Sequence, residues 1–372
     1  MVQSEFPLVS CINHCGMQLE VWNKTVFGHV GRKINELQKH LEWLELQPAF
    51  PGNIQDMRNT RRELNNWHEK KDAIWYQRSR INWFRDGDRN TSYFHAKALA
   101  RLKKNQIDGL LDAQEVWQED EGKVGDIVEE YYTSLFTTNH PIDFNEILQA
   151  IQPKVTTQMN QSLDKVFTAN EILAALKQMY PLKAPGPNGM PPLFYQKFMS
   201  IVGDVVTKTI LDFLNHGLYP PNFNETHIVL IPKVKKPKRV TDFRPISLCN
   251  VVFRITSKVI TNRLKKILPS IIGDTQSAFV RRRLITDNVL VAFKTMHHIN
   301  GKKGGKKGEM ALKLDMSQAY DRVEWLCLEK IMAKLGFGEK WRNFIMKCVT
   351  SVSYSIKING KPRGKIIPSR GI

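Results

Sequence analysis

Asp315 is the residue best placed for chemistry in this sequence. It ends the apolar run MALKL, and a helical pattern follows it. We therefore expect a strand over 310–315 that delivers the carboxylate to the start of a helix. A carboxylate at such a place can hold Mg²⁺, and capping the helix is the structural alternative. Phosphoryl transfer uses two ions about 3.5–4 Å apart, which a single aspartate cannot hold, so further carboxylates are needed.

The composition points to a polyanionic partner. The 372 residues include 55 Lys and Arg against 36 Asp and Glu, which gives a formal charge of +19. This surplus favours nucleic acid first and an anionic membrane surface second. No apolar run is long enough for a membrane span, so we predict no membrane partner. No secretory signal is expected at the N-terminus, and five cysteines favour reduced thiols inside the cell.

Residues 75–107 interleave basic and aromatic side chains. Basic groups neutralise phosphates, and aromatic rings stack on unpaired bases. An amphipathic helix with a solvated basic face explains the same composition, and both interpretations stay open here. The basic residues that we single out as candidates for nucleic-acid binding are Arg78, Arg80 and Arg85.

The remaining pattern defines the elements that must position these residues. Helical stripes over 28–47 and 54–81 predict an antiparallel helical hairpin. Residues 107–136 predict a short strand pair followed by a helix, and 139–166 have the composition of a linker. The second half predicts a capping box at Thr168 and Glu171, a Pro-Gly loop over 181–192, and a strand over 227–234. A helix that ends at Gly336 and a hairpin turning at Asn359-Gly360 follow. Strands alternating with helices indicate an α+β or α/β domain.

Five blocks of this chain, in order, resemble reverse transcriptases of plant LINE-type non-LTR retrotransposons. They are WYQRSRINWFRDGDRNTSYFH, APGPNGMPPLFYQKF, the run from IPKVKKPKRV to TNRL, TQSAFVRRRLITDNVLVAFKTMHHI and LKLDMSQAYDRVEW. The resemblance covers roughly residues 20–372. It implies an α+β fold, with the fingers and a partial palm of a right-hand polymerase preceded by a helical N-terminal region. It also implies a basic linker region over 1–140, a linker over 141–165 and the polymerase over 166–372.

The resemblance implies roles for individual residues. Asp315 matches the first catalytic metal ligand, and the backbone of Met316 faces the Mg²⁺. Tyr320 matches the aromatic residue under the nucleotide sugar. Further positions match residues that hold the incoming nucleotide or the template, namely Lys233, Arg244, Gln276, Phe279, Arg283 and Asn288, and Arg281 and Arg282 lie where they can meet phosphates. The implied partners are an RNA template, a DNA primer and deoxynucleotides.

The sequence also departs from the family pattern. The other catalytic carboxylates of the family lie in a later Asp-Asp hairpin, and this sequence contains no Asp-Asp pair. We therefore expect a truncated copy that does not extend a primer alone. Arg282 stands where the family has glycine, which predicts a strained turn. Asp321 is expected to pair locally with an arginine rather than to bind metal.

Three interpretations remain. The chain is a reverse transcriptase with two-metal nucleotidyl transfer in its full-length relatives; it is a non-catalytic basic nucleic-acid-binding module; or it does not fold stably. The resemblance implies an intracellular, nuclear location, for which the KVKKPKR run at 233–239 offers a weak signal.

Overall fold

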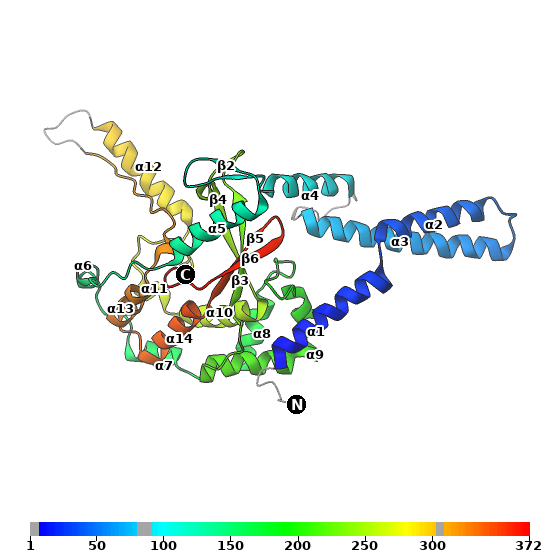
Figure 1. Ribbon diagram of the computed structural model, residues 1–372. Coiled ribbons are helices and arrows are strands. Elements are labelled where there is room, and N and C mark those ends of the chain that lie inside the picture. The colour runs from blue at the N-terminus through cyan, green and yellow to red at the C-terminus, as the bar shows by residue number, and fades with distance from the viewer. Residues whose placement is uncertain (1–6, 80–90, 303–308) are drawn as a thin grey trace.

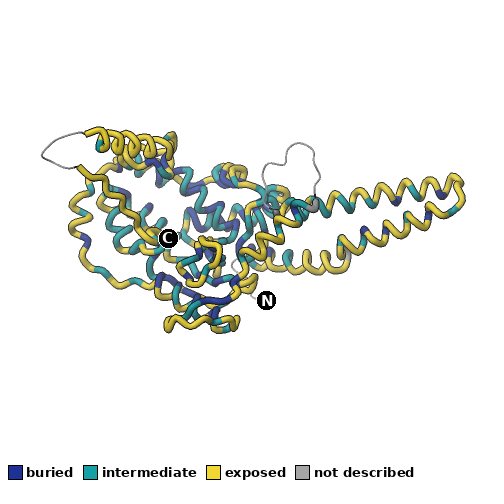
Figure 2. The backbone as a smooth tube through the Cα atoms, turned by 90° about the horizontal axis from the view of Figure 1, so that it is seen from above, coloured by how far each residue is buried: buried dark blue, intermediate teal, exposed yellow. Residues whose placement is uncertain are grey.

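The computed structural model describes residues 7–79, 91–302 and 309–372. A small sheet lies at the centre, helices surround it, and a long helical hairpin projects from one side (Figure 1). Figure 2 shows buried residues concentrated in the central body, whereas the projecting hairpin is largely exposed. The mixed helical and sheet composition expected from the sequence is confirmed.

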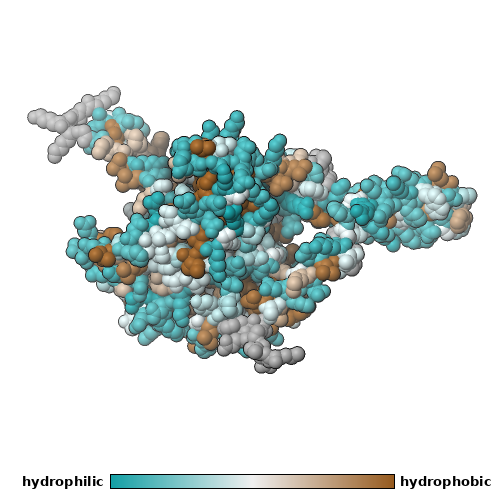
Figure 3. Space-filling view, in the orientation of Figure 1, coloured by the Kyte–Doolittle hydropathy of each residue, from teal (hydrophilic) through white to brown (hydrophobic). Residues whose placement is uncertain are grey.

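The N-terminal helical hairpin is confirmed. Its two arms bury Ile34, Leu37 and Leu44, which belong to the predicted apolar stripe. Asn53 fixes the turn, because its amide donates to the carbonyl of Leu44 at 3.2 Å and to that of Pro48 at 3.1 Å. Figure 3 shows hydrophobic side chains gathered at the outer end of this hairpin. The elements here are α1 (Pro7–Trp22), the π-helical turn η1 (Asn23–Phe27), α2 (Val30–Glu45) and α3 (Pro51–Ser79).

The next segment leads from the hairpin to the central sheet. The predicted short strand pair and the helix after it are confirmed. Asp120 caps that helix by accepting from the Lys123 amide at 2.9 Å. Its buried face carries Val128 and Tyr132, which pack against the sheet. The elements are α4 (Thr91–Asn105), β1 (Leu110–Leu111), β2 (Trp117–Gln118) and α5 (Glu121–Phe136).

The stretch over 139–166, which the composition predicts to be a linker, contains two short helices. This stretch forms α6 (Asn145–Gln149) and α7 (Thr157–Leu163). Thr156 caps α7 through the Met159 amide, and Leu163 is buried. The amides of residues 154 and 155 both donate to the Leu335 carbonyl at 2.9 Å, which holds the segment on a distant helix. The two helices are too short to show a helical periodicity in the sequence, and the contacts that stabilise them come from distant residues.

The central sheet has the strand order β4-β3-β5-β6. Strand β3 pairs antiparallel with β4 and parallel with β5, and β5 pairs antiparallel with β6. Asn359 and Gly360, with φ of 46° and 93°, make the predicted β5–β6 turn. The strands are β3 (Glu225–Pro232), β4 (Phe243–Cys249), β5 (Ser353–Ile358) and β6 (Lys361–Ile366), with a 3-10 turn η3 (Val240–Asp242) before β4.

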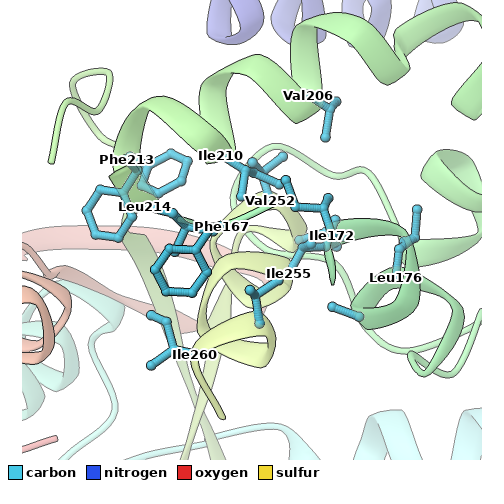
Figure 4. Close-up of a cluster of buried hydrophobic side chains, with 14 of the residues drawn as sticks. Phe167, Ile172, Leu176, Val206, Ile210, Phe213, Leu214, Val252, Ile255 and Ile260 are labelled. Carbon is cyan, nitrogen blue, oxygen red and sulfur yellow. The ribbon is translucent and has the colours of Figure 1, made fainter. Parts of the chain in front are cut away.

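The helices given at the end of this paragraph form the larger of the two apolar cores, part of which is shown in Figure 4. The predicted capping box of Thr168 and Glu171 is confirmed, and so is the helix end at Gly336, whose φ is 95°. Residues on both sides of 141–165 contribute to each of the two cores, so the division into regions there stays a prediction. The helices are α8 (Ala169–Lys177), α9 (Pro192–Leu211), η2 (Asp212–His216), α10 (Val251–Leu264), α11 (Leu268–Ile271), α13 (Trp325–Leu335) and α14 (Glu339–Thr350).

The strand expected over 310–315 is wrong. Residues 309–316 have no regular structure and are exposed throughout. Helix α12 (Ile285–Gly301), which precedes them, has no buried residue and stands out from the body in Figure 1. A strand needs a neighbour that pairs with its backbone groups, and no described segment pairs with this one. The apolar run MALKL therefore predicted a strand that has no paired neighbour in the described part of the chain. The short 3-10 helix η4 (Tyr320–Arg322) follows.

Candidate functional site

The β3–β4 hairpin brings Lys233 and Arg244 together on one exposed face. Ile231 lies opposite Arg244 in the strand register, and Lys233 follows two residues later, so the two cations are diagonal neighbours across the hairpin. The Lys233 amide donates to the Asp242 carbonyl at 2.7 Å, and its ammonium donates to the Thr241 carbonyl at 2.8 Å. Among the described residues, none forms a hydrogen bond or an ion pair with the Arg244 guanidinium. A point charge and a free guanidinium fork on one face can receive phosphate oxygens.

Asp321 lies close enough to Lys233 to sense its charge, which the sequence did not anticipate. It is half-buried, and burial raises the pKa of its carboxyl while the nearby charge of Lys233 lowers it. The expected pairing with an arginine is wrong within the described residues, because no ion pair of Asp321 with an arginine forms there. Tyr132 and Tyr354 are also close enough to sense its charge. Only the tertiary fold brings these residues together, so no local signal could have found the cluster.

Asp315 lies on the exposed segment before η4. Its side chain is exposed, as is that of Met316, which is 79% exposed. Tyr320 is 59% exposed, and its carbonyl accepts from the Ile372 amide at 3.1 Å. Because residues 309–316 are not held in the sheet, the structure does not bring Asp315 into contact with the Lys233 hairpin. The roles that the resemblance implies for these three residues stay predictions.

The loop before α12 is held by Arg283. Its guanidinium donates to the carbonyls of Gly273 at 2.5 Å and Gln276 at 2.8 Å, and it pairs with Asp274 at 3.2 Å. The Ser277 hydroxyl donates to the amide oxygen of Asn288 at 2.9 Å, which ties the loop to the helix. Arg283 therefore stabilises the loop before α12 through its own hydrogen bonds. The template and nucleotide roles of Gln276, Arg283 and Asn288 stay predictions.

Arg281 and Arg282 extend from the same loop into solvent. Arg282 has a φ of 67°, which is the left-handed conformation that glycine adopts without cost, so the strained turn expected there is confirmed. Phe279 shares this conformation with a φ of 65°, and 80% of its surface is exposed. The loop thus presents two cations and an aromatic ring on one exposed, backbone-constrained turn. Such a surface can bind a nucleic-acid strand.

The Pro-Gly loop is anchored to the end of β4. A Cβ at Gly186 would overlap the backbone nitrogen of Asn250, so only glycine fits this close backbone approach. The Asn188 amide donates to the side-chain oxygen of Asn250 at 3.1 Å. Arg254 donates to the carbonyls of Cys249 at 3.1 Å and Ala184 at 2.5 Å. The sequence predicted only a loop that separates two elements, whereas the structure shows an ordered loop that packs against the end of β4.

Of the basic candidates in the N-terminal region, Arg78 lies near the end of α3, with its guanidinium 5.2 Å from the Trp75 ring centre. Arg80 and Arg85 lie outside the described residues. Within the described residues, no group of three or more His, Cys, Asp or Glu side chains is arranged to hold a metal ion. The residues around Asp315 therefore do not fit a magnesium site as they stand. Over the same ranges, no helix is both long and apolar enough to cross a membrane.

The chain is similar in sequence to several known proteins. Residues 231–372 match the family model of reverse transcriptase (RNA-dependent DNA polymerase). This range includes the tip of the β3–β4 hairpin with Lys233 and Arg244, Asp315 and the β5–β6 hairpin. The transposon TX1 uncharacterized 149 kDa protein of Xenopus laevis is 26% identical over 366 residues, which is 96% of this chain and 28% of that protein.

Two retrovirus-related Pol polyproteins of retrotransposable elements are also similar. That of R2DM from Drosophila melanogaster is 24% identical over 217 residues, 58% of this chain and 20% of its own length. That of R2 from Nasonia vitripennis is 24% identical over 191 residues, 51% and 18% of the two lengths. The chain thus spans less than a third of each of these relatives. Residues 231–372 are thus similar to reverse transcriptases, and the chain as a whole is similar to proteins of transposable elements.

Proposed function

We propose that this chain is part of an RNA-directed DNA polymerase of a non-LTR retrotransposon. The observation that carries the proposal is the family match over 231–372, which spans both the cation pair on the β3–β4 hairpin and Asp315. In this proposal Lys233 and Arg244 bind the phosphates of the incoming deoxynucleotide. RNA is the template and DNA the primer. Residues 166–372 supply the fingers and part of the palm, and the plant LINE-type group is the source.

We propose that the 372 residues alone have too few suitably placed carboxylates to bind the Mg²⁺ needed for DNA synthesis. Reverse transcriptases generally use Mg²⁺, and no carboxylate cluster suited to it forms among the described residues. We propose that Asp315 becomes a metal ligand only beside carboxylates that these 372 residues do not supply. The exposure of Met310, Leu312 and Leu314 supports this, because a paired strand at this place would bury such side chains.

The test is template-directed DNA synthesis on an RNA template with an annealed DNA primer. The transcript is first sequenced through the codon of Ile372, and both the 372-residue chain and any longer product are purified. We expect no extension by the 372-residue chain and extension by a longer product that contains an Asp-Asp hairpin. Asp315→Asn should abolish that extension, whereas Asp204→Asn, an exposed carboxylate on α9, should not. Extension that survives Asp315→Asn would contradict the proposal.

A second function is favoured by the charge of the chain. A basic module that binds nucleic acid without catalysis needs only the surplus of +19 and exposed cations such as Arg281. It predicts salt-dependent RNA binding that is unchanged by Asp315→Ala, with no synthesis by any product of the transcript. Synthesis by the longer product would exclude it.

We also propose a nuclear location, since the exposed lysines of the β3–β4 tip belong to a basic run. A fluorescent fusion of the chain, compared with a variant in which Lys235, Lys236 and Lys238 are glutamine, tests this. Equal distribution of both fusions between nucleus and cytoplasm would contradict it.

A further inference from the structure

A basic cleft lies at the base of the projecting hairpin. The start of α2 lies beside the last turns of α3 because the two helices are antiparallel (Figure 1). Residues of η1 also line the cleft. The cleft has a volume of about 590 Å³, within the range of about 300–1,000 Å³ that is typical of ligand sites. Its lining consists of Asn23, Lys24, Gly28, His29, Val30, Gly31, Arg32, Lys71, Ile74, Trp75 and Arg78.

The charge of this cleft has one sign. All of the charged residues that line it in the described part of the chain are basic, and they come from three different elements. Lys24 pairs with Glu20 at 2.7 Å, and both of these side chains are exposed, so that pair is weak. No described residue forms an ion pair with Arg32, Lys71 or Arg78. Three cations therefore face a shared space without a counter-charge.

Trp75 gives the cleft a fixed wall. The His95 ring of α4 packs edge-on against the indole with centroids 4.0 Å apart, and Arg78 lies over the same indole at 5.2 Å. These contacts hold the Arg78 guanidinium at the rim of the cleft. The positive charge is specific to this cleft and is not shared by every cleft of the protein. Another cleft, along α5, is lined by the acidic residues Asp126, Glu129 and Glu130.

We propose that this cleft binds phosphodiester groups of a nucleic-acid strand. This rests on the proposed function, since the polymerase must hold an RNA template and a DNA primer. A guanidinium binds phosphate oxygens in a bidentate manner and an ammonium binds them as a point charge, so Arg32, Lys71 and Arg78 together can receive successive phosphates. The cleft lies on the projecting hairpin, away from the segment over 309–316 (Figure 1), so it positions the strand and takes no part in the reaction.

The experiment measures binding of labelled 20-nucleotide RNA and DNA single strands by the full chain across a salt series. The test variant is Lys71→Gln with Arg78→Gln, and the matched control is Lys177→Gln with Lys334→Gln, two exposed lysines of α8 and α13. We expect the test variant to bind roughly tenfold more weakly, with a salt slope reduced by about 0.7 for each phosphate that the variant no longer neutralises. The control should change neither quantity.

The outcomes separate this inference from the proposed function. Equal loss on RNA and DNA supports backbone recognition, and loss on one of the two identifies the strand that occupies the cleft. Equal affinities of the test and control variants would overturn the cleft assignment while synthesis by the longer product still stands. Absence of binding by the unmodified chain would overturn the cleft assignment too. If circular dichroism shows that the double variant loses helix, Arg32→Gln on α2 provides the same test without altering α3.

Discussion

The side chain of Asn359, at the β5–β6 turn, holds both backbone groups of Ile107. The Ile107 amide donates to the Asn359 side-chain oxygen at 2.9 Å, and the Asn359 amide donates to the Ile107 carbonyl at 3.0 Å. The two residues are 252 positions apart. This pair joins the N-terminal region to the sheet, and Asn359 also has the left-handed backbone that the turn requires, with a φ of 46°.

We expect Asn359→Gly to lower the free energy of unfolding by about 1–3 kcal/mol, because two partly buried backbone groups lose their partners. Asn359→Ala should cost about 1 kcal/mol more, since alanine resists the left-handed conformation and glycine does not. Urea unfolding of the three proteins checks both values. Equal stability of the glycine variant and the unmodified chain would show that the side-chain bonds contribute nothing.

Arg263 on α10 is a buried cation with several hydrogen-bond partners. It pairs with Glu171 at 2.8 Å, donates to the carbonyls of Leu163 at 2.8 Å and Val166 at 2.9 Å, and lies 3.5 Å from the Phe167 ring centre. Only 7% of its side chain is exposed. We expect Arg263→Met to lower the free energy of unfolding by about 3–5 kcal/mol, because several buried acceptors lose their donor. Arg263→Lys should recover only part of this, since an ammonium cannot reach them all.

Chemical unfolding of both Arg263 variants tests this stabilisation. As a control, Arg281→Met removes an exposed arginine and should change stability by less than about 0.5 kcal/mol. A loss below about 1 kcal/mol for Arg263→Met would contradict the assigned role.

The same pair predicts a pH dependence. The hydrogen bond from Arg263 is the main cause that lowers the pKa of Glu171 below the ordinary value of 4.5. The unfolded chain therefore binds more protons just below pH 4.5, so the stabilisation is complete above that pH and is lost as pH falls through the lower folded pKa. Glu171→Gln should remove this part of the acid sensitivity. Stability curves between about pH 6 and pH 3 measure it, with Glu42→Gln on the exposed face of α2 as the control.

The strained turn at Arg282 makes a stabilising substitution available. A non-glycine residue in the left-handed region costs about 1–2 kcal/mol, and glycine removes this cost but adds unfolded-state entropy. We expect Arg282→Gly to raise stability by up to about 1 kcal/mol, while Arg282→Lys leaves it unchanged. Thermal unfolding distinguishes the two variants. A destabilising Arg282→Gly would show that the arginine side chain makes a favourable contribution larger than the strain.

The segment before Asp315 exposes a row of apolar side chains. Met310, Leu312 and Leu314 are 86%, 73% and 79% exposed, and they alternate in the sequence with Ala311 and Lys313. An exposed strand-like apolar face favours association of chains. We expect Leu312→Lys with Leu314→Lys to reduce light scattering of concentrated protein several-fold without loss of stability. Lys313→Gln, which leaves the apolar row intact, is the control; equal scattering by the double variant and the unmodified chain would contradict the expectation.

The sequence by itself determined the local elements. The 4-3-4-3 apolar spacing over 28–47 predicted the hairpin of α2 and α3, and Asn359-Gly360 and Gly336 set a turn and a helix end. These features depend on side-chain period and backbone conformation, which neighbouring residues decide. The motifs around Lys233, Arg244 and Asp315 pointed to the polymerase class, to which the family match over 231–372 also points.

Only the tertiary structure decided what holds these elements together. The segment at 310–315 has the sequence of a strand, yet it forms none because a strand needs a paired neighbour that the local pattern does not specify. Asp321 lies near Lys233, although the two residues come from segments far apart in the sequence. Such proximity arises from packing between distant segments. It is therefore absent from any window of the sequence and visible only in the folded chain.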